Sequence, residues 1–212
     1  GIFLTMLSSG ANLAPMIFPL MSGFVLIGPI AAIGLYEISR RREAGLDSSW
    51  THALDVRHSP ALPSIIAVGL LLFGMFTVWL VTAQTIYANL LGEVFPRSMS
   101  LFVQQVFGTP EGMQLILWGN LVGLGFALVV LAITVVTFPM LLDRDCGAVA
   151  AMVASVRATF INPIPVLLWG LIVAVALVIG TIPLFIGLAL VIPILGHATW
   201  HLYRKLISRE AM

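Results

Sequence analysis

The feature that most constrains this chain is the length of its uncharged apolar runs. The first charged residue is Glu37, and residues 2–36 carry no charge. A single helix of that length would measure about 50 Å at about 1.5 Å per residue, whereas the hydrocarbon core of a bilayer is about 30 Å thick. The run therefore predicts two membrane segments, residues 2–9 and 13–38, separated by polar residues. It also starts without a methionine, so we expect the first segment to be truncated.

Composition supports lipid as the main solvent. Charged residues make up 9% of the chain, hydrophobic residues 60%, and the mean hydropathy is +1.09. A soluble domain carries about 25% charged residues, so a large water-facing surface cannot be built here. The formal net charge of +1 predicts no attraction to nucleic acid.

The remaining apolar runs predict helices over residues 62–91, 113–142 and 164–202. The last run is too long for one span, and we expect it to divide near residues 180–183. Residues 92–112 have the pattern of an amphipathic loop. Short interfacial helices are predicted within residues 37–60 and over residues 145–160, the second ending at Asn162-Pro163. The predicted fold is an all-α polytopic bundle of about six membrane segments, forming one domain over residues 1–212.

Basic residues set the predicted orientation. Nine of the ten lysines and arginines fall in the loops after residues 38 and 142 or at the C-terminus, and only Arg97 falls on the other side. The positive-inside rule makes the nine-residue side cytoplasmic. We expect a multi-pass protein of the bacterial inner membrane with a cytoplasmic C-terminus.

The polar residues of the predicted helices have structural interpretations. Charges where helices leave the membrane favour ion pairing between helix ends, a buried amide favours interhelical hydrogen bonding, and small residues at four-residue spacing favour close helix packing. Trp200 is typical of an interfacial anchor. The structural candidates are Glu37, Arg40, Asp143, Arg144, Asn120, Gly119, Gly123 and Trp200.

His197 and His201 share a helical face, and with Asp143 they are the weak candidates for a metal site. A zinc helix also needs a carboxylate base and a third ligand, and the residues between these histidines supply neither. Haem–copper oxidase chemistry needs six membrane histidines, and the chain has four in total. We therefore predict no catalytic, metal or cofactor site.

Four segments resemble a family of bacterial predicted integral membrane proteins of unknown function, sometimes mislabelled as cytochrome c oxidase subunit I. They are residues 28–41 (GPIAAIGLYEISRR), 139–144 (PMLLDR), 162–163 (NP) and 196–204 (GHATWHLYR). The resemblance implies a multi-pass membrane protein with a polar leader before Gly1. It implies no activity, so no catalytic residue is carried over.

Two functional interpretations remain open. The first is a non-catalytic accessory or assembly subunit that packs against a larger bioenergetic membrane complex, with lipids and a membrane protein as partners. The alternative is a small-solute transporter or channel built from repeated helical hairpins. A lipid-modifying enzyme comes third, because its only candidate residues are His197, His201 and Asp143.

The topology is testable by cysteine-accessibility labelling. We expect cysteines placed at Ser48 and Ser208 to react only with reagents that reach the cytoplasm, because both lie on the side that holds nine of the ten basic residues. Labelling of either position from the periplasm would overturn the predicted orientation.

Overall fold

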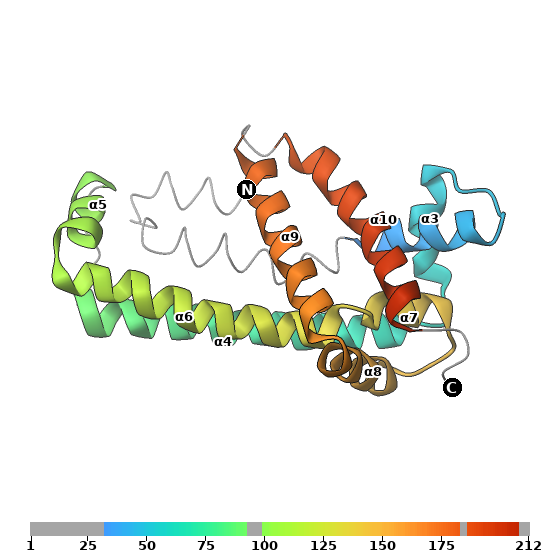
Figure 1. Ribbon diagram of the computed structural model, residues 1–212, viewed down its shortest axis with the longest axis horizontal. Helices are drawn as coiled ribbons and strands as arrows, with labels where there is room; N and C mark the ends of the chain where they lie inside the picture. Colours follow the sequence, from blue (N-terminus) through green and yellow to red (C-terminus); the bar gives the residue numbers. More distant parts are fainter. Residues whose placement is uncertain (1–31, 93–98, 183–185, 208–212) are drawn as a thin grey trace. The chain divides into compact units, whose positions relative to one another are not determined.

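The computed structural model describes residues 32–92, 99–182 and 186–207 (Figure 1), and every regular element in these ranges is a helix. The predicted all-α class is therefore confirmed. The predicted segment 2–9 and most of the segment 13–38 lie outside the described residues. Three described helical segments are long and apolar enough to cross a membrane: residues 62–91, 110–143 and 163–181.

Helix α4 has the expected limits, Leu62–Leu91. The last apolar run divides near the expected position into α9, Pro163–Thr181, and α10, Leu188–Leu206, which ends four residues later than predicted. Helix α8 covers Ala148–Ile161 and ends where expected, because the residue before Pro163 is disfavoured in the α region. Pro163 then occupies the first turn of α9, where its missing N–H costs nothing.

Three other expectations were wrong in detail. Helix α3, Ile33–Glu43, extends past residue 38, where a helix was expected to end. The predicted loop 92–112 contains the helix α5, Met99–Gly108. The interfacial helix expected before α4 is a 3₁₀ helix, η1, Trp50–His58, on which both Trp50 and Leu54 are exposed.

The helix predicted over residues 113–142 is broken. It consists of α6, Pro110–Thr134, and α7, Thr137–Asp143, separated by Val135 and Val136. Pro139 explains the position of the break, because a proline ring clashes with the carbonyl of the residue four positions earlier, here Val135. The sequence thus contained the signal for this break.

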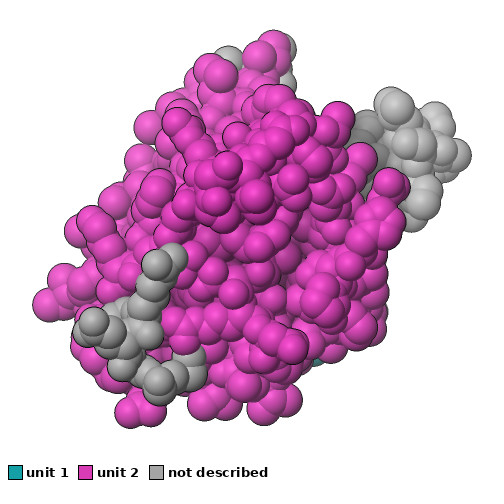
Figure 2. Space-filling model, turned by 90° about the vertical axis from the view of Figure 1, so that its right-hand side faces the viewer, with its two compact units in different colours: residues 1–27, 72–128 teal, residues 28–71, 129–212 magenta. Residues whose placement is uncertain are grey.

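The chain forms two compact units, residues 1–27 with 72–128 and residues 28–71 with 129–212. Figure 2 shows one face of the second unit. In the first unit, Trp79 is buried and packs on Gly123, where an added Cβ would lie 3.1 Å from the indole ring. Phe126 completes this contact with its ring centroid 5.6 Å from that of Trp79.

In the second unit, α10 packs against α3, α7 and α9, while η1 packs against α3. Gly196 permits the close approach of α10 to α3, since an added Cβ would lie 2.8 Å from Leu35. Helix α3 ends at Glu43 and is followed by Gly45, whose φ of 69° is the left-handed conformation that closes a helix C-terminus. This turn returns the chain to η1.

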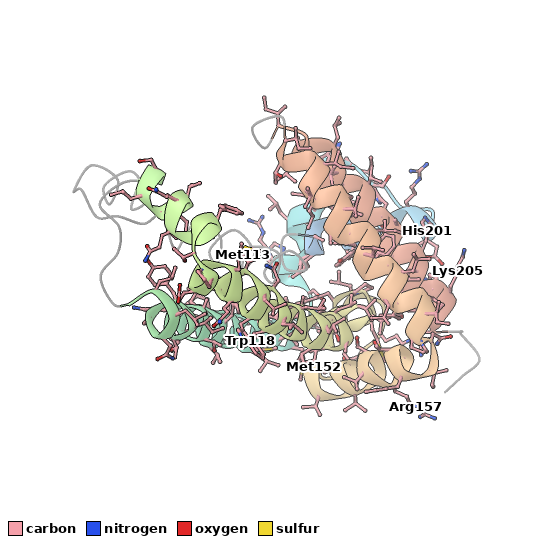
Figure 3. The ribbon with its side chains drawn as sticks, turned by 60° about the vertical axis from the view of Figure 1, so that its left-hand side comes forward. Met113, Trp118, Met152, Arg157, His201 and Lys205 are labelled. Carbon is pink, nitrogen blue, oxygen red and sulfur yellow. The ribbon has the colours of Figure 1, made fainter. Side chains whose placement is uncertain are left out.

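Helix α8 has one buried and one exposed face. Ala151, Ser155 and Ala158 are buried, whereas Val149 and Phe160 are more than two-thirds exposed. The chain changes direction sharply between α8, marked by Met152 and Arg157 in Figure 3, and α9. The predicted helix over residues 145–160 is therefore confirmed as a helix with an apolar outer stripe.

Ser155 satisfies the backbone that the α6–α7 break leaves open. Its hydroxyl donates to the carbonyl of Ala132 at 2.7 Å and accepts from the N–H of Val136 at 3.3 Å. Ser155 and Val136 are both fully buried. Because a buried backbone group without a partner is costly, one side chain of α8 stabilises the break.

We expect Ser155→Ala to lower the free energy of unfolding by about 1–3 kcal/mol, because it leaves the buried Val136 N–H without an acceptor. Thr159→Ala is the matched control. The Thr159 hydroxyl donates to the carbonyl of Ser155 in its own helix, so its removal should cost less than about 0.5 kcal/mol. Denaturant titration of the purified chain in detergent measures both. Equal effects of the two substitutions would contradict this role of Ser155.

Candidate functional site

The central feature of the second unit is the side chain of Arg204, near the C-terminal end of α10. Its Nη1 and Nη2 donate to the two carboxylate oxygens of Asp143, at 2.7 and 2.8 Å, and its Nε donates to Glu43 at 2.9 Å. Asp143 ends α7 and Glu43 ends α3. A bidentate arginine–carboxylate pair is both strong and geometrically specific. Arg204 therefore joins the ends of three helices.

Two aromatic residues enclose this network. Trp200 and Tyr203 are fully buried, and the Arg204 guanidinium carbon lies 5.0 and 5.5 Å from their ring centroids. The indole N–H of Trp200 donates to Glu43 at 2.8 Å, and the Tyr203 hydroxyl donates to Asp143 at 2.6 Å. Both rings thus combine cation–π contact with a hydrogen bond to the same carboxylates.

A second set of polar contacts lies on the other turns of α3. Glu37, only 5% exposed, accepts from Nε and Nη2 of Arg40 at 2.8 and 2.7 Å. The Ser39 hydroxyl lies 2.7 Å from His197 Nδ1. His201, one turn further along α10, is exposed (Figure 3). The two histidines therefore have different surroundings.

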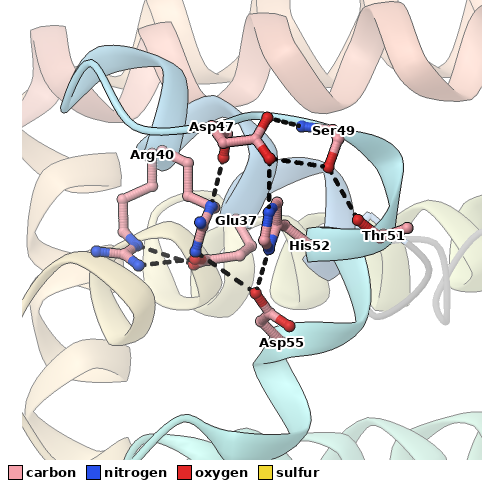
Figure 4. Close-up of polar contacts among 8 residues, drawn as sticks. Glu37, Arg40, Asp47, Ser49, Thr51, His52 and Asp55 are labelled. Atoms are coloured by element: carbon pink, nitrogen blue, oxygen red, sulfur yellow. Dashed lines mark hydrogen bonds and ion pairs between the residues drawn. The ribbon is translucent and has the colours of Figure 1, made fainter.

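The loop between α3 and α4 is held by His52. Its Nδ1 lies 2.6 Å from Asp55 and its Nε2 lies 3.0 Å from Asp47 (Figure 4). Arg41 of α3 donates to the carbonyl of Asp47 at 2.7 Å and is paired with Asp55 at 3.4 Å. These contacts connect η1 to α3 through charged side chains.

Between these groups lies a cleft of about 360 Å³, formed by the end of α3, residues 55–61 and the end of α7. Its apolar lining includes Leu141 and Leu142. Its ionisable lining residues are Glu37, Arg40, Arg41, Asp55, His58, Asp143, Arg144 and Asp145. The cleft thus brings together positive and negative side chains beside the end of α7 and the start of α4.

A family described as a predicted integral membrane protein, DUF2189, matches residues 17–143, more than half of the sequence. The chain belongs to the DUF2189 family. It is accordingly an integral membrane protein, as the sequence resemblance predicted. Neither the curated proteins nor the solved structures include a match to it.

The DUF2189 match contains only part of the ionic network. Glu37, Glu43 and Asp143 lie within residues 17–143, whereas Trp200 and Arg204 lie beyond them. The matched region therefore supplies the carboxylates, and the following helices supply the arginine and the aromatic rings.

The structure places the other candidates from the sequence as follows. Arg144 lines the cleft, and its Nε lies 3.9 Å from Asp143. Asn120 is exposed and donates to the carbonyl of Ile116 in its own helix. An added Cβ at Gly119 would meet no described atom within 4 Å, unlike Gly123. Arg204 and Tyr203 are the Asp143 partners that sequence reasoning missed.

The weak metal candidates do not meet in the structure. His197 contacts Ser39, and Asp143 is bonded to Arg204 and Tyr203. Across the described ranges, no three histidine, cysteine, aspartate or glutamate side chains gather in a way that could hold a metal ion. The site supports ionic packing between helix ends.

We expect the His52 imidazole to titrate above its usual pKa of 6.5, because hydrogen bonds to Asp55 and then to Asp47 favour its charged form. The same contacts lower the pKa of both carboxyl groups. The contribution of His52 to loop stability is thus present below about pH 6.5 and lost as pH rises through its raised pKa. The contribution of Asp47 and Asp55 to loop stability is lost as pH falls through the lowered pKa values of their carboxyl groups.

NMR titration of ¹³C-labelled histidine measures this directly. Asp55→Asn removes the charged hydrogen-bond partner that raises the His52 pKa most. The substitution should therefore bring this pKa back toward its usual value. A wild-type His52 that titrates at or below 6.5 would show that the loop does not adopt these contacts.

Proposed function

We propose that this DUF2189 protein is a non-catalytic accessory or assembly subunit of a larger membrane complex. The observation that carries the proposal is the mutual pairing of charges at the ends of α3, α7 and α10. Asp143 and Glu43 are bonded to Arg204 and to buried aromatic residues. Such an arrangement fixes helix ends, whereas acid–base catalysis needs a group that can reach a substrate proton.

Polar side chains within the candidate spans support the same proposal. The hydroxyls of Thr77, Thr82 and Thr85 in α4 donate to carbonyls four residues earlier, as does the Asn120 amide in α6. Bonds of this kind satisfy polar groups inside their own helix. They favour a packing role for these helices over a solute path.

Helix α9 offers the surface for a partner. Only 11% of the apolar 18-residue stretch in α9 is buried within the described chain. The buried share of the corresponding stretch in residues 110–143 is 33%. The exposed side chains of α9 include Leu168, Leu171 and Val175. We propose that a membrane partner covers this face, that the C-terminus is cytoplasmic, and that the membrane is the bacterial inner membrane, as the distribution of basic residues predicts.

One observation favours the alternative, a small-solute transporter. The break between α6 and α7 interrupts a candidate span, and discontinuous helices often form transport sites. Ser155 already binds the opened backbone at Val136, however. The subunit role therefore remains the better-supported proposal.

Site-specific photocrosslinking in native membranes tests the two functions. A photoreactive residue at Leu171 should form one protein adduct of constant mass, and mild-detergent extracts should contain the chain in a complex of fixed stoichiometry. The same residue at Leu70, an exposed position on α4, is the matched control. Lipid adducts alone at Leu171, together with solute flux in liposomes that contain only this chain, would contradict the proposal and support a transporter.

A further inference from the structure

The cleft lies beside the start of one candidate membrane span and the end of another. Its lining comes from the end of α3, from residues that immediately precede α4, and from the end of α7. Residues 62–91 and 110–143 are candidate spans, so the beginning of one and the end of the other lie on the same side of the bilayer. That side carries the basic residues. The cleft is therefore at the depth of lipid headgroups.

The charges of the cleft are nearly balanced. Three arginines and four carboxylates line it, with His58 as the remaining ionisable group. Four carboxylates disfavour a purely anionic ligand, and three guanidinium groups disfavour a purely cationic one. A ligand that carries a positive and a negative group close together satisfies both sets.

Part of the hydrogen-bonding capacity of the cleft remains open to a ligand. Nε and Nη2 of Arg40 donate to Glu37. The two N–H groups of Nη1, out of five in the guanidinium, are not used in this pair and can donate to a ligand. Arg40 is 35% exposed at its side chain. On the acidic side, Asp145 is exposed and the Asp55 side chain is 41% exposed. The cleft thus offers donors for a phosphate and acceptors for an ammonium group.

We propose that this cleft binds the headgroup of a zwitterionic phospholipid that carries a primary ammonium beside its phosphate. Arg40 and Arg144 bind the phosphate, Asp145 and Asp55 bind the ammonium, and Leu142 contacts the start of the lipid chains. A primary ammonium has three N–H donors for carboxylates. A trimethylammonium group is instead recognised by the rings of Trp, Tyr or Phe, and the described residues that line the cleft include none of these three.

The test uses the purified full chain in detergent and native mass spectrometry with short-chain lipids. Dioctanoyl phosphatidylethanolamine should bind about tenfold more tightly than the phosphatidylglycerol and phosphatidylcholine of equal chain length, because each of these lacks one matching group. Free O-phosphoethanolamine has the same headgroup chemistry without chains and should bind more weakly than the lipid. If it binds as tightly, the ligand is a soluble metabolite and the proposal of a lipid site is overturned.

Two variants assign the two halves of the site. Asp145→Asn should reduce phosphatidylethanolamine binding about fivefold to tenfold while affecting phosphatidylglycerol little, because only the ammonium partner is lost. Arg144→Gln should weaken both lipids by a similar factor. Glu111→Gln and Arg157→Gln remove charges elsewhere in the chain and should change neither.

The helix content and the elution volume of each variant show whether a loss of lipid binding comes from misfolding. Asp145 is exposed, so Asp145→Asn should retain the helix content and elution volume of the parent chain. A folded Asp145→Asn variant with unchanged lipid preference would overturn the proposal. Equal binding of all three lipids by the parent chain would overturn it as well. The lipid proposal does not depend on the subunit role.

Discussion

The described part of the second unit depends on one guanidinium group. Arg204 binds carboxylates from α3 and α7 and lies against two buried aromatic rings of its own helix. Charges at this degree of burial carry a desolvation cost, which only several well-aligned hydrogen bonds offset. The Trp200 and Tyr203 hydrogen bonds satisfy further lone pairs of the same carboxylates. The position of α10 between α3 and α7 follows from this arrangement.

The same requirement, that buried polar groups find partners, governs the break between α6 and α7. Pro139 prevents a continuous helix, and the opened backbone at Val136 is bonded to Ser155. Ser155 can reach it because α8 has a face of small residues, Ala151 and Ala158 among them, that is buried in the unit. One proline therefore specifies both the kink and the need for a helix that crosses it.

The sequence predicted helix limits wherever composition or proline sets them, as in α4 and at Asn162-Pro163. Pro139 encodes the break at Val135, but the apolar run around it has a suitable length for one span, so hydropathy alone predicts an unbroken helix. The candidate site was only half predicted. Glu37, Arg40 and Asp143 were identified as ionic helix ends, but the Asp143 partner lies 61 residues away on α10. Periodicity within one helix carries no information on such a pairing.

The central claim is that the ionic network holds the helix ends together. A double-mutant cycle between Asp143→Asn and Arg204→Gln, with unfolding free energies measured in detergent, isolates the energy of that contact. We predict a coupling energy of about 1–3 kcal/mol, since the pair is bidentate and largely shielded from solvent. A coupling energy within about 0.3 kcal/mol of zero would show that the two side chains act independently and would contradict this account.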